Sequence, residues 1–240
     1  MTIWFSESFT TRPAAEGTFL MKDLQPKLRN RSRRAGGFTL LELAAVMAIS
    51  LIVSTFSMLS MVPVVKQYRL TNAYNTTLSA LRQARDSAVS QRTSYAVTFS
   101  TTGTSSTITV TPTFTGFQGA QNTVTYQLPT DVSFDAEPAL ASTPPPDGYG
   151  SGQVAIDFGY TANGGSGGAT TIYFCPDGSA RDAEGGSGNC AGSWDGGVVY
   201  IARAGDAMSS RAVTLWGGTG RIRGWRLYSN GSGGYQWLRQ

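Results

Sequence analysis

Glu42 raises the first chemical question in this sequence, because it is the single charged residue in an apolar run from Phe38 to Val65. The other residues of the run are apolar, small or hydroxylated. On insertion scales a carboxylate at the centre of a bilayer costs about 2.5–3.5 kcal/mol, so a Glu near one end of such a run usually has a partner or a task. The alternative is a Glu that lies at headgroup depth and does nothing.

The run is longer than the roughly 20 residues that an α-helix needs to cross a bilayer, which predicts a membrane span. An ordinary secretory signal carries its cleavage site after a shorter apolar core, whereas here the small pair Gly36-Gly37 comes before the run. Cleavage at this pair would remove a basic leader and leave the apolar segment on the mature protein. The positive-inside rule keeps that leader cytoplasmic, because four arginines stand directly before the run: Arg29, Arg31, Arg33 and Arg34.

Residues 36–43, Gly-Gly-Phe-Thr-Leu-Leu-Glu-Leu, resemble the type III signal of type IV pilins and type II secretion pseudopilins. The resemblance implies that a prepilin peptidase cleaves the Gly37–Phe38 bond and that Phe38 is then N-methylated. It also implies an assembly role for Glu42, the fifth mature residue, whose carboxylate meets the N-terminal amine of a neighbouring subunit. Opposite charges in apolar surroundings neutralise each other and fix the register. The implied partners are the peptidase, other pilins or pseudopilins, and the bacterial inner membrane.

The predicted leader covers residues 1–37, which is long for this family. Met21 begins a shorter leader, and we expect it to be the true start. Residues 1–20 would then be upstream sequence or an extension, and they are excluded from reasoning about the fold.

Charge is unevenly distributed along the chain. The formal net charge is +4, but from Phe38 onward there are 12 Lys and Arg and 12 Asp and Glu, so the net charge indicates no class of partner. Residues 131–195 carry nine acids and one Arg, whereas residues 203–240 carry six Arg and one acid. Such asymmetry can steer a polyanion or order the docking of subunits. A surface on which these charges are interspersed in three dimensions is the alternative.

The commonest catalytic side chain and the short motifs of several large enzyme classes are missing from the sequence. Histidine is absent, which removes the commonest general base and the commonest metal ligand. No G-x-S-x-G, P-loop or H-E-x-x-H pattern takes its place. We therefore expect no enzyme activity, no cofactor and no metal.

Cys175 and Cys190 are the only cysteines, and both follow the predicted span, in what would be the periplasm. Disulfides persist in that compartment, whereas a zinc site needs about four ligands. The sequence therefore predicts a disulfide. Acidic residues crowd the loop between the cysteines and could hold calcium, but their spacing matches no EF-hand, so a solvated acidic loop is the preferred interpretation: Asp177, Asp182 and Glu184.

One helix is predicted from Phe38 to about Gln91, within an N-terminal segment of residues 38–92. Its first half would lie in membrane or filament core, and Pro63 tends to kink a helix. Its second half carries an apolar stripe with spacings of three and four residues, which predicts packing against the head. The stripe consists of Leu70, Tyr74, Leu78, Leu81, Ala84 and Ala88.

The head, residues 93–240, shows a different period. Short segments rich in Val, Ile, Thr and aromatic residues alternate with turn residues, which predicts strands. The fold class expected is α+β and pilin-like, with a long transmembrane helix packed on an antiparallel two-sheet β-sandwich. Eight strands are predicted, at residues 95–100, 106–114, 123–129, 154–160, 170–174, 197–204, 211–216 and 220–229.

The segments TIYFCPDGSA, GVVYIARA and RAVTLWGGTGRIR are similar to those of the FimT, FimU and GspH group of minor pilins and pseudopilins. Arg221 and Arg223 would point to one face of a strand, with Arg226 and several aromatic residues close by. This Gly-Arg-x-Arg pattern resembles that of FimT-type pilins that bind DNA. Paired guanidiniums contact phosphates and aromatic rings stack on bases, but the same pattern closes the last strand of minor pilins with no DNA role.

Two functions follow from these observations. The first is a minor pilin or pseudopilin that assembles into, primes or caps a type IV pilus or a type II secretion pseudopilus. The second is a pilus-borne subunit that binds DNA through Arg221, Arg223 and Arg226. The first accounts for the whole chain, whereas the second accounts only for its C-terminal end.

Overall fold

A computed structural model describes residues 37–102, 105–113, 123–161, 167–185 and 190–240. The chain divides into two units, residues 1–50 and 51–240. The arginines before the apolar run and the start expected at Met21 lie outside the described residues. In the first unit, the described part consists of Gly37 to Thr39 and the first turns of helix α1, which begins at Leu40.

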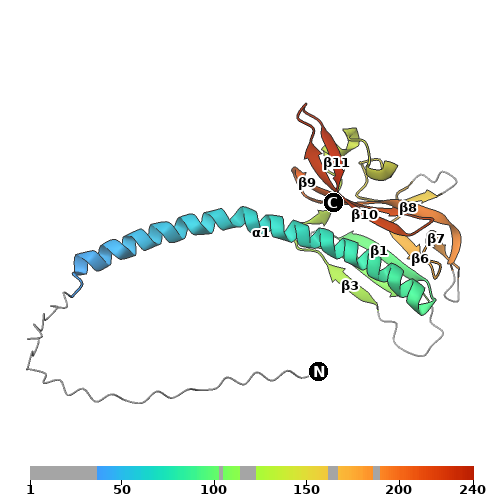
Figure 1. Ribbon diagram of the computed structural model, residues 1–240, viewed down its shortest axis with the longest axis horizontal. Coiled ribbons are helices and arrows are strands. Elements are labelled where there is room, and N and C mark those ends of the chain that lie inside the picture. The colour runs from blue at the N-terminus through green and yellow to red at the C-terminus, as the bar shows by residue number, and fades with distance from the viewer. Residues whose placement is uncertain (1–36, 103–104, 114–122, 162–166, 186–189) are drawn as a thin grey trace, which may run out of the picture. The chain divides into compact units, whose positions relative to one another are not determined.

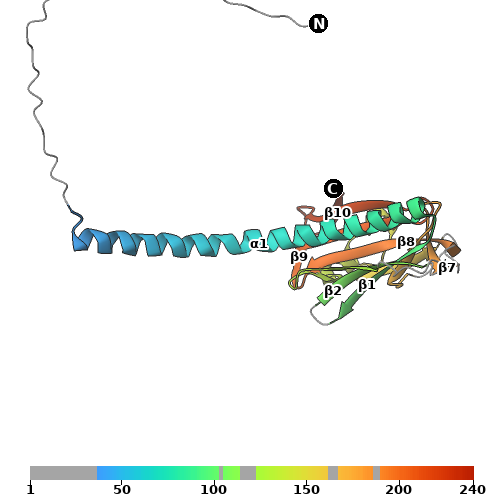
Figure 2. The same cartoon turned by 90° about the horizontal axis from the view of Figure 1, so that it is seen from below.

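Helix α1 runs from Leu40 to Gln91, and the prediction of one long apolar helix is confirmed. Pro63 lies inside the helix without ending it. By length and composition this helix can cross a membrane. The predicted stripe is buried along the second half of α1, where the helix lies along the sheet (Figures 1 and 2). Tyr74 comes so close to Gly224 that a Cβ there would overlap the tyrosine hydroxyl, so this approach of helix and sheet requires glycine.

The head is one large sheet, and its strand pairs are antiparallel, as predicted. Its strands follow the order β11-β10-β9-β8-β7-β6-β1-β2-β3, and β4 and β5 pair with β8 outside this path. The bounds are β1 Tyr95–Thr102, β2 Ser105–Pro112, β3 Val124–Gln127, β4 Ser133–Phe134, β5 Ile156–Thr161, β6 Thr171–Phe174, β7 Ala180–Glu184, β8 Cys190–Arg203, β9 Asp206–Trp216, β10 Arg221–Ser229 and β11 Tyr235–Arg239.

Strand β8 explains why two separate sheets are not seen. It is 14 residues long, and its first half pairs with β7 while its second half pairs with β9, β5 and β4. The strands on either side of β8 are therefore joined in one hydrogen-bonded path, and the predicted two-sheet sandwich is not shown. Glycines at 192 and 196 hid the first half of this strand, because glycine is depleted in strands.

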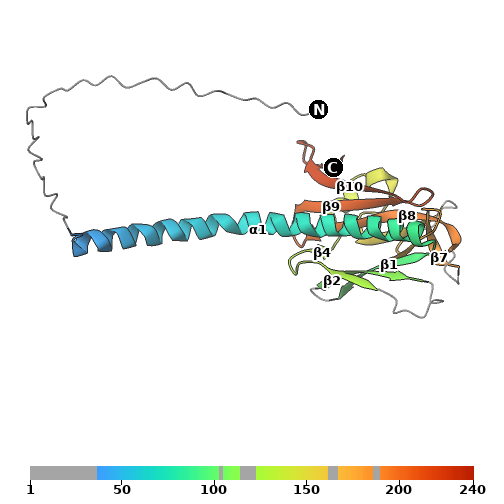
Figure 3. The ribbon, with the colours of Figure 1, turned by 60° about the horizontal axis from the view of Figure 1, so that its bottom comes forward.

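Two groups of buried side chains lie on the two faces of the sheet. The larger group joins the buried face of α1 to residues such as Val199 and Val213, on the face of β8 and β9 toward the helix (Figure 3). The smaller group, on the other face, contains Val198, Tyr200 and Leu227. Leu140 joins it from the 3-10 helix Pro138–Ser142, and a second 3-10 helix, Pro146–Gly148, follows in the same connection. Fully burying one such aliphatic side chain stabilises the fold by about 1.5–3 kcal/mol.

Candidate functional site

The N-terminal end of α1 carries the residues for which the sequence predicts processing. Thr39 precedes the first helical residue, and its Oγ1 accepts a hydrogen bond from the Glu42 amide at 3.2 Å. Its carbonyl oxygen accepts from the amides of Glu42 and Leu43 at 3.0 and 3.1 Å. Thr39 is therefore the N-cap, and these bonds satisfy amides that a helix start leaves unpaired. This cap was not predicted from the sequence, although a Thr followed three residues later by a Glu is a known pattern of a helix N-terminus.

This end of the helix is open to its surroundings. Phe38 is 78% exposed, and Glu42 is exposed too. Nothing lies within 4 Å of the position that a Cβ of Gly37 would occupy. Within the described residues, the carboxylate of Glu42 forms no ion pair with a basic group. Its place in the first turn puts a negative charge at the positive end of the helix dipole, which is favourable.

The apolar run has no cover from the rest of the described chain. Every residue from Phe38 to Val65 is exposed, and the most apolar 18-residue window of α1 contains no buried residue. Soluble monomers rarely expose an apolar surface of this extent. This segment is therefore a surface built to be covered by lipid or by other protein.

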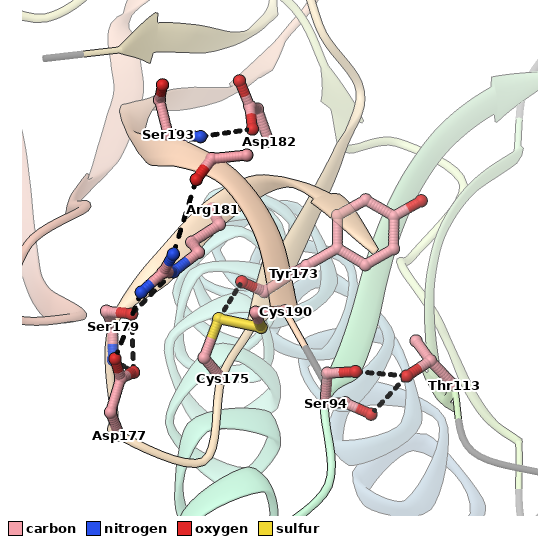
Figure 4. The surroundings of a disulfide bond; sticks show 11 residues. Ser94, Thr113, Tyr173, Cys175, Asp177, Ser179, Arg181, Asp182, Cys190 and Ser193 are labelled. Atoms are coloured by element: carbon pink, nitrogen blue, oxygen red, sulfur yellow. Dashed lines mark hydrogen bonds and ion pairs between the residues drawn. A yellow bond between two sulfur atoms is a disulfide. The ribbon is translucent and has the colours of Figure 1, made fainter. Parts of the chain in front are cut away.

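A disulfide joins Cys175 to Cys190, with Cα atoms 5.7 Å apart. It ties the turn after β6 to the first residue of β8 (Figure 4). Asp177 in this turn accepts hydrogen bonds from the amide and hydroxyl of Ser179 and pairs with Arg181 at 3.4 Å. Burial alone would raise the pKa of Asp177, but these hydrogen bonds and the Arg181 charge outweigh it, and the pKa lies below its usual value. The carboxylate of Asp177 is therefore engaged in hydrogen bonds and an ion pair within the turn itself.

The three arginines predicted to bind DNA do not form one surface. Successive residues of a strand point to opposite faces, so Arg221 and Arg223 share one face of β10 and Arg226 lies on the other. Arg223 contacts Asp147, with Nη1 and Oδ1 2.5 Å apart, and Thr214 donates a hydrogen bond to the same carboxylate at 2.8 Å. The charge of Arg223 is therefore neutralised within the head, and of the three only Arg221 is exposed.

Arg226 faces the helix side of the sheet, opposite Arg211 on β9. Its guanidinium lies 5.1 Å from the centre of the Tyr228 ring. Burial and, after it, the positive charge of Arg226 lower the pKa of Arg211 to about 10. Of the nearby aromatic residues, Trp225 and Trp237 pack on the smaller buried group instead of forming an open stacking surface.

Comparison with known proteins finds one family model, the prokaryotic N-terminal methylation motif, which matches residues 32–58. The match includes Gly37, Phe38 and Glu42 and ends within the apolar run. No curated protein and no solved structure shows a significant match. The motif supports a type IV pilin-like or pseudopilin-like subunit, processed by a prepilin peptidase and anchored by a single apolar helix. It does not extend into the head.

Proposed function

We propose that this chain is a minor pilin or pseudopilin, built through the first half of α1 into a type IV pilus or a type II secretion pseudopilus. The observation that carries the proposal is the methylation motif placed at the start of a wholly exposed apolar helix segment. Before assembly the segment would span the bacterial inner membrane, with the leader in the cytoplasm and the head in the periplasm. In the filament, equivalent segments of other subunits would cover it. A position at the tip, where the subunit would prime or cap the filament, is our expectation for this group.

Cleavage of the Gly37–Phe38 bond would create a positively charged amine in an electrostatically unfavourable position. The amine of Phe38 carries a positive charge and lies at the positive end of the α1 dipole, where a cation is disfavoured. A carboxylate from a neighbouring subunit would offset this repulsion. Glu42 fits the role, because it is exposed within an apolar surface and has no ion-pair partner in the described part of its own chain. A charge pair of this kind would also fix the axial offset between neighbouring helices.

The test of this proposal is the mass of the mature N-terminus. The full chain, produced in a host that contains a prepilin peptidase, should begin with N-methylated Phe38. Replacement Gly37→Leu should block maturation, because a bulky side chain then precedes the cleaved bond. The matched control, Ala44→Leu, adds the same bulk to the exposed apolar run and should mature normally. An unprocessed wild-type chain, or a mature terminus at another residue, would exclude the pilin function.

DNA binding stays a prediction that no observation favours. Arg223 is paired with Asp147, and Arg226 lies on the opposite face of β10 from Arg221. An electrostatic DNA surface needs several exposed cations on one side. We therefore propose the structural role alone.

A further inference from the structure

The face of the sheet that carries the smaller buried group also carries a pocket of about 440 Å³. Four aromatic side chains line it from separate elements: Tyr149 after the second 3-10 helix, Tyr160 from β5, Trp194 from β8 and Trp216 from β9. The rest of the lining comes from Thr161 and from glycines at 148, 196, 217 and 218. Neither the sequence motifs nor the proposed filament role accounts for this pocket.

The aromatic walls are held in place before any ligand arrives. The ring of Tyr149 lies 5.8 Å from that of Tyr160 and 5.7 Å from that of Trp216, centre to centre, at steep angles of 69° and 77°. A Cβ on Gly196 would come within 3.0 Å of the Tyr149 hydroxyl, so this glycine is needed for the ring to lie against the strand. The Tyr160 hydroxyl donates a hydrogen bond to Asp157 at 3.2 Å.

Asp147 fixes the turn that presents Tyr149. Its backbone is in the left-handed region, with φ of 54°, which an Asp tolerates better than most residues. Its side chain accepts hydrogen bonds from Thr214 and Arg223, as described above. The arrangement places Tyr149 over the sheet, so Arg223 acts here as a positioning residue. A preformed aromatic pocket with few polar groups is typical of a ligand site.

Near the pocket, Arg223 is paired with Asp147, and Arg181, opposite Trp194 in the sheet, is paired with Asp177. The charges that remain without an ion-pair partner among the described residues nearby belong to the carboxylates of Asp157 and Asp195. Among the described residues that line the pocket, none is Lys or Arg. Asp157 is buried and hydrogen-bonded to the Tyr160 hydroxyl, and Asp195 is buried in β8 between two residues of the lining, with its side chain on the other face of the strand. Burial raises the pKa of Tyr149, and the charges of Asp147 and Asp195 raise it further. Oδ1 of Asp195 accepts a hydrogen bond from the Gly159 amide, whereas its buried Oδ2 has no hydrogen-bond partner among the described residues.

Two of the walls are only half covered. Trp194 is 53% exposed and Trp216 is 45% exposed, so large π faces remain open to solvent. A cation over a Trp or Tyr face is attracted by the ring quadrupole, most strongly where water is displaced. An anion or a phosphate would be repelled by the carboxylates. A neutral apolar group would fit the rings but would gain nothing from the negative field.

We infer that this pocket binds an alkylammonium cation. The cation is either a quaternary ammonium, as in a choline headgroup, or the protonated amine of a lysine side chain from another protein. Both carry a compact positive charge at the end of an alkyl chain, which is the chemistry that aromatic walls and nearby carboxylates recognise. This inference does not depend on the filament role, because it concerns the head alone.

The experiment is a ligand-detected NMR titration of the full chain in an uncharged polyoxyethylene detergent, which itself contains no ammonium group. The probes are tetramethylammonium, choline and N-acetyl-lysine amide, with neutral 3,3-dimethylbutan-1-ol as the isostere of choline. At pH 8, where Asp195 is ionised, we expect saturable binding of the cations and at least tenfold weaker binding of the isostere. Preference for choline would identify a headgroup as the source, and preference for the lysine amide would identify a protein.

Variants connect the binding to the pocket. Trp194→Leu keeps an apolar side chain but removes the π face, and it should weaken cation binding about tenfold, since one desolvated cation–π contact is worth on the order of this factor. The matched control Tyr228→Leu removes an aromatic ring outside the pocket, one that Arg226 already occupies. It should leave binding unchanged. Asp195→Asn should weaken the cations a few-fold and leave the isostere unaffected.

Several outcomes would overturn the inference. These are no saturable cation binding, equal affinity for choline and its neutral isostere, equal loss in Trp194→Leu and Tyr228→Leu, or displacement of the cations by a DNA oligonucleotide that itself binds the pocket. Because Trp194 is largely exposed, its replacement should leave the thermal unfolding curve nearly unchanged. An unfolding curve shifted by less than 2 °C would verify that the variant is folded. Should it unfold, the Asp195→Asn comparison of choline with its isostere decides the question alone.

Discussion

Asp195 is a fully buried carboxylate; within the part of the chain that the structure describes, one oxygen accepts a hydrogen bond from the Gly159 amide and the other has no hydrogen-bond partner. Burial raises its pKa from 3.8 to about 6. Between these pH values the native protein holds a proton that the unfolded chain has released, so the free energy of unfolding falls as the pH rises through this window. At neutral pH the cost of this ionised group is about 3 kcal/mol, at 1.36 kcal/mol for each pKa unit.

Replacement Asp195→Asn should therefore stabilise the head at pH 7.5 by about 1–3 kcal/mol and flatten the dependence of stability on pH between 4 and 6. Urea unfolding across this pH range measures both effects. The control Asp86→Asn removes an exposed carboxylate of α1 and should leave the pH profile as it is. A lower stability of the Asn variant at pH 7.5 would contradict the burial argument. The sequence offered no sign of this residue, because nothing in a Trp-Asp-Gly-Gly stretch reports that a strand passes through the core.

Glu42 is the other residue with a specific expectation. Glu42→Gln removes the charge and keeps the size, so membrane insertion should be retained or improved. Incorporation into filaments should fall, because the amine of Phe38 then lacks its partner. Counting subunits in sheared filaments and in the membrane fraction separates the two effects. Asp131→Asn, which affects only a partly exposed pair with Arg69 at 3.5 Å, serves as the control. Normal incorporation of the Gln variant would argue against the assembly role.

At the scale of elements, the hairpin of β7 and β8 depends on the disulfide. Strand β7 has the sequence Ala-Arg-Asp-Ala-Glu, which is polar and has low strand propensity. Replacement of both cysteines by serine should lower the free energy of unfolding by about 3 kcal/mol in the chain-entropy model. Amide exchange should accelerate first in β7 and in the first half of β8. Equal protection with and without the bond would show that strand pairing alone holds this hairpin.

The sequence predicted elements well where one face of an element is buried and less well elsewhere. Helix α1 and the eight strands rich in β-branched and aromatic residues were visible, because their side chains report the core directly. Strands β4, β7 and β11 were not predicted. The first has only two residues, β7 has a single buried residue, and β11 packs only two half-buried rings, Tyr235 and Trp237, on the smaller buried group.

At the scale of the whole molecule, the head should fold without the apolar half of α1, because its first buried residue is Leu70. A chain beginning at Gln67 should be soluble and monomeric. A control chain beginning at Asn75 also lacks Leu70, Ala73 and Tyr74 and should lose several kcal/mol of stability, as expected when core side chains are removed. Circular dichroism melts of the two chains measure the difference. Equal melting temperatures would mean that the helix contributes little to the core.

The path of the sheet, which no local pattern revealed, leaves two outer strands, β3 at one end and β11 at the other. Both are short, with four and five residues, and most of their residues are exposed and polar or half exposed. A long, flat, apolar strand in such a position would offer its unpaired amides and carbonyls to any neighbouring chain, which is how sheets aggregate. The risk of such edge-to-edge pairing would be greatest for subunits packed side by side. In a filament, these blunt ends would leave lateral contact to the helix and would keep the heads from fusing into a continuous cross-β stack.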